Sequence, residues 1–116
     1  MTSRRKLKRL LARRQLLIAP GVFDGLSARL VEEAGFEAIY LSGGAVARSM
    51  GVPDIGLLTM SEVIERAVQV VAAVKIPVIA DADTGYGNAL NLVRAVREFE
   101  RAAPRVHRPN GMVGRA

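Results

Sequence analysis

Hydrophobic and polar residues follow two different patterns along this chain. Three short apolar runs have the length and composition of buried strands: residues 16–20, 37–42 and 77–81. Elsewhere, apolar residues recur every three or four positions, which is typical of helices that pack one face on a core. This second pattern predicts four helices, at residues 4–15, 26–34, 59–74 and 88–101. The chain is therefore expected to form one helix followed by three strand–helix units.

Local signals indicate where the predicted helices begin and end. Asp24 is placed to cap the helix at 26–34, and Gly35 is placed to stop it. Thr59 and Glu62 form a T-x-x-E capping box at the start of the next helix. The face of the 26–34 helix that we expect to be buried consists of Leu26, Leu30, Val31 and Ala34.

The strands predict the class of the fold. They are apolar on both faces, as in a parallel sheet covered by helices, and right-handed crossovers would make all three parallel. This is the α/β class, in which ligands bind beyond the carboxyl ends of the strands. After the second strand, the glycine-rich stretch at 43–57 is expected to be a long loop.

The composition excludes several classes of protein. Half of the 116 residues are hydrophobic, which argues against a disordered chain. No apolar run approaches the roughly 18 residues that a bilayer span needs, and we expect a cytoplasmic protein without a membrane partner. The chain has no cysteine, which excludes a disulfide framework, a thiolate metal site and a cysteine nucleophile.

Basic residues are concentrated at the start of the chain. The net charge is +6, and residues 1–14 hold seven of the 17 lysines and arginines and no acid. The rest of the chain carries 10 basic and 11 acidic residues. The leader could bind a polyanion, but no aromatic residue interleaves its charges, as single-strand recognition needs. We therefore favour a solvated helix that docks through its leucines, and expect no nucleic-acid partner.

Two aspartates stand where the third strand ends, in the sequence "PVIADADTGYG". Asp81 and Asp83 are two positions apart, so a continuing strand would place both carboxylates on the same side. Close carboxylates repel unless a cation lies between them, and hard oxygen ligands favour magnesium or manganese. The alternative is that Asp83 caps a turn and Asp81 is a solvated strand end. The spacing leaves both interpretations open.

Other polar groups follow the second strand. Ser42, Gly43 and Gly44 could bind a carboxylate or phosphate through backbone N–H groups, although such a triplet more often forms an ordinary tight turn. Asp54 could be an acid–base group, and local evidence favours a turn residue. Tyr40 could bind a ligand or lie at the rim. All of these residues are expected at the same edge of the sheet.

Three segments together resemble a known superfamily. They are "APGVFDGLSARLVEEAGFEAIYLSGGA", "GVPDIGLLTMSEV" and "IPVIADADTGYGNALNLVRAVREFERA". In this order they closely resemble the isocitrate lyase / phosphoenolpyruvate mutase superfamily over about residues 5–102, nearest to its methylisocitrate lyase and carboxyphosphonoenolpyruvate phosphonomutase branches. The resemblance implies a (β/α)8 TIM barrel, homo-oligomeric full-length relatives and Mg²⁺, with Mn²⁺ as a substitute.

The resemblance also implies roles for particular residues. Family members make or break C–C or P–C bonds next to a carboxylate, and their lyases pass through a pyruvate enolate. The substrate, a small 2-oxo or 2-hydroxy carboxylate such as 2-methylisocitrate, would contact Tyr40, Ser42, Gly43, Gly44 and Asp81. Asp54 matches a catalytic loop aspartate. Asp81 and Asp83 match the pair that coordinates the metal, directly or through water.

The chain departs from the family pattern after the third predicted unit. Relatives continue with a fourth strand and a loop that carries a catalytic cysteine, whereas this sequence has "APRVHRPNGMVGRA". We therefore expect a partial barrel at 1–103 and a disordered tail outside the family pattern at 104–116. The expected function is a Mg²⁺-dependent C–C lyase that is truncated and inactive. The alternatives are a phosphonomutase, an oxaloacetate decarboxylase, or a non-catalytic fragment that folds with a partner chain.

Overall fold

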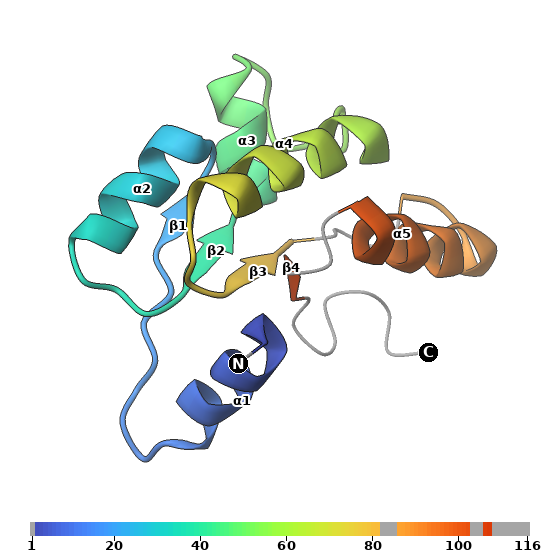
Figure 1. The fold of residues 1–116 in the computed structure, drawn as a ribbon. Helices are drawn as coiled ribbons and strands as arrows, with labels where there is room; N and C mark the ends of the chain where they lie inside the picture. Colours follow the sequence, from blue (N-terminus) through green and yellow to red (C-terminus); the bar gives the residue numbers. More distant parts are fainter. Residues whose placement is uncertain (1, 82–85, 103–105, 108–116) are drawn as a thin grey trace.

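The computed structural model describes residues 2–81, 86–102 and 106–107. Its helices are α1 (Ser3–Ala12), α2 (Gly25–Glu33), α3 (Gly43–Ser49), α4 (Met60–Ala73) and α5 (Ala89–Ala102). Its strands are β1 (Gly21–Val22), β2 (Ile39–Leu41), β3 (Val78–Ala80) and β4 (Val106–His107). Figure 1 shows the strands side by side, with α2, α3 and α4 above them and α1 below.

The sheet is parallel and its strands follow the order of the chain, β1-β2-β3-β4. Tyr40 in β2 lies opposite Gly21 on one side and Ile79 on the other. Adjacent parallel strands joined through helices are the arrangement of a TIM barrel, so the expected α/β class and partial barrel are confirmed. The short strand β4 was not predicted, because we expected no strand after residue 103.

The hydrophobic core lies on the face of the sheet that α2 and α4 cover. Ile39 and Leu41 of β2 are fully buried there, and so is Val70 of α4. Because side chains alternate along a strand, the residues between them point to the other face. Tyr40 and Ile79 lie on that second face and are only half-buried. The sheet thus has one covered face and one open face.

The predicted helix caps are confirmed. The Asp24 carboxylate accepts a hydrogen bond from the Ser27 backbone N–H at 2.8 Å, and the Ser27 hydroxyl completes a capping box. Thr59 and Glu62 form the second capping box, at the start of α4. Gly35 has a φ of +96° just after α2, in the left-handed region where glycine carries no steric penalty.

The first predicted strand is misplaced. The apolar run at 16–20 is not a strand, and Leu16 is 86% exposed. Pairing begins at the end of this run instead, where the Pro20 carbonyl accepts from the Tyr40 N–H at 2.9 Å and the Val22 carbonyl accepts from the Ser42 N–H at 3.2 Å. The strand is defined by this long-range pairing, which local hydrophobicity does not report.

The predicted buried face of α2 is wrong in part. Leu26 and Leu30 are 68% and 58% exposed, whereas Ala28 is fully buried. Small residues carry the contact with α4: a Cβ at Gly25 would lie 3.4 Å from the Cβ of Ala73. Close packing of the two helix backbones therefore selects the small face and turns the two leucines outward.

Among the described helices, none has both the length and the hydropathy to cross a bilayer.

Candidate functional site

The site begins where β2 runs into a helix instead of the loop that we predicted. The Ser42 hydroxyl accepts a hydrogen bond from the Ala45 backbone N–H at 3.2 Å and caps α3. Such capping satisfies a helix N–H group that would otherwise have no partner. Gly43 and Gly44 consequently form the first turn of α3, at the carboxyl end of the sheet.

Asp81 lies beside this turn, immediately after β3. Its backbone N–H donates to the Leu41 carbonyl at 3.0 Å, which extends the pairing of β2 and β3 by one step. The Tyr40 hydroxyl donates a hydrogen bond to the Asp81 carboxylate. Burial raises the pKa of Tyr40 above its usual value, and the negative charge of Asp81 adds to the effect. Tyr40 is therefore a protonated hydrogen-bond donor at neutral pH.

The glycine at position 43 makes room for this carboxylate. A Cβ at Gly43 would lie 3.0 Å from Oδ2 and 3.4 Å from Cγ of Asp81. A methyl group at that distance would push the carboxylate aside. The absence of a side chain at Gly43 thus lets Asp81 lie directly against the backbone of α3.

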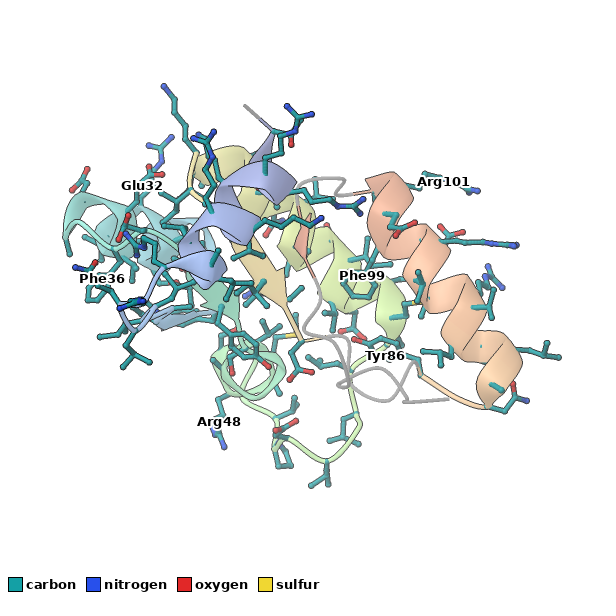
Figure 2. All side chains as sticks on the ribbon, turned by 90° about the horizontal axis from the view of Figure 1, so that it is seen from below. Glu32, Phe36, Arg48, Tyr86, Phe99 and Arg101 are labelled. Atoms are coloured by element: carbon teal, nitrogen blue, oxygen red, sulfur yellow. The ribbon has the colours of Figure 1, made fainter. Side chains whose placement is uncertain are left out.

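Gly44 has the same relation to a second acid. A Cβ at Gly44 would lie 2.9 Å from Oδ2 of Asp54 and 3.0 Å from Nη1 of Arg48. Asp54 belongs to the exposed loop between α3 and α4 and reaches back over the start of α3. Arg48, which Figure 2 labels, brings a positive charge to the same glycine from the last turn of α3.

A cavity of about 100 Å³ joins the two acids. Asp54 and Asp81 both line it, as do Gly43 and Tyr86, and its apolar wall includes Leu58. Two carboxylates, a glycine backbone and an aromatic ring around a small cavity are suited to a small polar ligand with a cation. The predicted edge of the sheet is therefore where these groups meet.

Sequence reasoning missed Tyr86. This residue has a φ of +63°, which is uncommon for a residue other than glycine, and its ring stacks on Phe99 of α5 with centroids 6.5 Å apart. Figure 2 shows both rings between α5 and the rest of the molecule. The triplet "GYG" was too short to indicate a site, and its aromatic residue between two glycines was the available signal.

The predicted residues occupy this site unequally. Tyr40 and Ser42 support it from β2 and the start of α3, while Gly43, Asp54 and Asp81 line the cavity. Asp83 lies outside the described residues. Within the described ranges, no three His, Cys, Asp or Glu side chains gather closely enough to enclose a metal ion.

Parallel strands with acids at their carboxyl ends define an α/β protein with a barrel-type ligand site. Comparison with known proteins is consistent with this class. A family model described as phosphoenolpyruvate phosphomutase matches residues 7–104. The chain therefore belongs to this family, within the superfamily that its motifs predicted.

Individual relatives support the assignment. The chain is 47% identical over 103 residues to the 2,3-dimethylmalate lyase of Eubacterium barkeri, covering 88% of this chain and 36% of that protein. It is 48% identical over 96 residues to a 2-methylisocitrate lyase of Aeropyrum pernix, covering 83% and 31%. Among solved structures, a phosphonopyruvate hydrolase complex with oxalate and Mg²⁺ aligns with a TM-score of 0.84 and 39% identity, covering 89% and 36%. The chain thus spans about a third of the length of these relatives.

Proposed function

We propose that this chain forms the metal- and substrate-binding part of a Mg²⁺-dependent C–C lyase. The substrate is a small 2-hydroxy polycarboxylate such as 2-methylisocitrate, which is cleaved through a pyruvate enolate. The observation that carries the proposal is the meeting of Asp54 and Asp81 at one small cavity. The similarity to two lyases that act on branched hydroxy acids favours this reaction within the family.

The residues present are compatible with a magnesium ion. The Asp81 carboxylate supplies hard oxygen ligands, and Gly43 leaves space beside it that a side chain would fill. Asp83 is the proposed second ligand, and water and substrate oxygens would complete the coordination. Bound Mg²⁺ supplies positive charge that stabilises the negative charge of an enolate.

The chain's own groups bind and orient the substrate. The first backbone N–H groups of α3 are proposed to hold the substrate's carboxylate and oxo group, next to Gly43 and Gly44. Tyr40 keeps its proton and holds the Asp81 carboxylate in place through its hydrogen bond. Asp54, from the loop before α4, contacts the reacting part of the substrate.

We further propose that the 116-residue chain alone binds these ligands without turning them over. The resemblance implies that family lyases use a cysteine loop, and this chain contains no cysteine. That absence is the specific observation in favour of the second candidate, a non-catalytic fragment that needs a partner chain to fold. Within the family, a phosphonomutase or an oxaloacetate decarboxylase would use the same metal and carboxylate groups.

Metal binding is the direct test of the site. Electron paramagnetic resonance of Mn²⁺, used as a substitute for Mg²⁺, would measure affinity with and without oxalate. We expect Asp81→Asn to weaken Mn²⁺ binding by about tenfold or more, because even the loss of a group that only supports a metal ligand typically weakens binding by about 10–100-fold. Glu65→Gln removes an exposed acid of α4 that does not line the cavity, and it should leave affinity unchanged. Equal affinities in Asp81→Asn and the unsubstituted chain would contradict the proposal.

Product analysis separates the candidate reactions. The purified chain with Mg²⁺ is incubated with 2-methylisocitrate, phosphoenolpyruvate or oxaloacetate, and the loss of each is followed by NMR. We expect metal binding but no pyruvate release from 2-methylisocitrate. Release at a rate that depends on Asp54 would show instead that the chain is an active lyase by itself.

A further inference from the structure

A second cavity lies at the opposite end of the sheet from the acids. It has a volume of about 360 Å³ and lies between α1 and the turns that lead into β2 and β3. Its apolar wall includes Leu10, Phe36 and Ile76. In Figure 2, which views the molecule from below, α1 crosses in front of the sheet with Phe36 beside it. This volume falls in the range of about 300–1,000 Å³ that is typical of small-molecule sites.

Positive charges surround this apolar wall. Lys6 and Arg9 enter from α1, and Lys75 enters from the turn before β3. In the described part of the chain, none of their side chains makes an ion pair. The cavity also contains the acid Glu37, but both of its oxygens accept from Arg13, at 3.1 and 2.9 Å. The acid is thus paired and three cations remain available.

Specific contacts hold the walls in place. The bidentate pair between Arg13 and Glu37 ties the residue after α1 to the turn before β2. The Glu32 carboxylate accepts from the backbone N–H groups of Lys75 and Ile76, at 2.7 and 3.1 Å, and fixes the turn before β3. An apolar cavity with fixed walls and free cations can bind a ligand without first having to order itself.

We propose that this cavity binds an amphipathic organic anion, with its charged head at the cations and its apolar tail against Leu10, Phe36 and Ile76. A charged head alone would be screened by salt, and a tail alone would leave the cations without partners. Both parts together match the lining. This site is independent of the metal site at the other end of the strands.

Calorimetric titration of the 116-residue chain with three probes tests the proposal. Octanoate carries both parts of the expected ligand, acetate carries only the charge, and 1-octanol carries only the tail. We expect saturable binding of octanoate, and affinities at least about tenfold weaker for the other two. 1-Octanol loses the interaction with the charged groups and acetate loses the buried methylene groups, and either loss costs that much. Octanoate binding no tighter than that of acetate or 1-octanol would overturn the proposal.

Paired charge reversals test the location. Lys6→Glu with Arg9→Glu removes two cations from the cavity, and we expect octanoate affinity to fall by about tenfold or more. Arg4→Glu with Lys8→Glu changes the net charge equally on the other side of α1, because successive residues are about 100° apart around a helix. This control should retain octanoate affinity. Equal losses in the two double variants would show attraction to the basic helix as a whole and would overturn the site.

A variant-free measurement covers the case in which charge reversal unfolds the chain. Octanoate should shift the backbone amide NMR signals of Phe36, Glu37 and Ile76 and leave those of the Asp54 loop unchanged. Asp81→Asn should retain octanoate affinity even where it loses Mn²⁺, so that failure of one site is distinguishable from failure of the other. Shifts confined to the Asp54 loop would place the ligand elsewhere and contradict the proposal.

Discussion

The covered and open faces of the sheet use neighbouring residues of the same strand for opposite purposes. On the covered face, Ile39 and Leu41 are fully buried under the helices. On the open face, Tyr40 between them is half-buried and holds the carboxylate of Asp81. The packed core and the polar contacts of the candidate site are thus separated by a single step along the strand, because consecutive side chains point in opposite directions.

The test with the largest expected effect removes the same side-chain atoms from the covered face and from the open face. Ile39→Ala deletes a fully buried side chain, and we expect a loss of about 3 kcal/mol in the free energy of unfolding. Ile79→Ala makes the identical change on the open face, where the half-buried side chain should contribute about 1 kcal/mol. Urea unfolding followed by circular dichroism measures both. Equal losses would mean that the open face is covered in solution, for instance by a second chain.

A test with a smaller expected effect adds a methyl group at Gly43, beside the Asp81 carboxylate. Gly43→Ala would put a Cβ 3.0 Å from the Asp81 carboxylate, so we expect Mn²⁺ affinity to fall by about tenfold. Stability should not fall, because the carboxylate can turn aside and alanine favours a helix by up to about 1 kcal/mol over glycine.

Gly21→Ala is the matched control for this methyl group. Its nearest neighbour would be the Ser42 Cβ at 3.8 Å, an ordinary contact, and metal affinity should stay unchanged. A Gly43→Ala variant that binds Mn²⁺ normally would show that Asp81 does not need its position against α3.

The parts of the fold that could be predicted are those with strong local signals. The caps at Asp24 and Thr59 are set by side chains bonding backbone groups three residues away, so the sequence alone identifies them. The strands at 39–41 and 78–80 lie inside predicted apolar runs, and their parallel pairing follows from the helices between them. These features also placed the candidate site, because the carboxyl ends of parallel strands share one edge.

The misplaced features depend on contacts between distant residues. β1 begins at Gly21 because β2 pairs there, and Leu26 points outward because Gly25 and Ala28 let α2 approach α4 closely. The helix α3 was hidden by its two glycines, which favour a turn until the Ser42 hydroxyl caps them. Tyr86 reaches the cavity through its stacking on Phe99 of α5, which no local pattern reports.

The test with the smallest expected effect concerns the hydroxyl proton of Tyr40 on the open face. Burial is the larger cause of the raised pKa of Tyr40, and the charge of Asp81 is the next. Asp81→Asn removes that charge and weakens the hydrogen bond with the Tyr40 hydroxyl but leaves the burial, so the Tyr40 pKa should fall and yet stay above its usual value of 10.0. Tyr86→Phe leaves Tyr40 as the sole tyrosine, and in that background ultraviolet absorption of tyrosinate follows it alone.

The same proton links stability to alkaline pH. A tyrosine whose pKa is higher in the folded state than in the unfolded chain keeps its proton longer when folded. Its contribution to stability is therefore complete below the unfolded pKa and is lost as the pH rises through the folded one. Removing the Asp81 charge brings the two pKa values closer, so stability should fall less steeply above pH 10 in Asp81→Asn than in the unsubstituted chain. Identical slopes and an unchanged Tyr40 pKa would show that the two side chains do not interact, and the open face would lose the contact that holds its carboxylate in place.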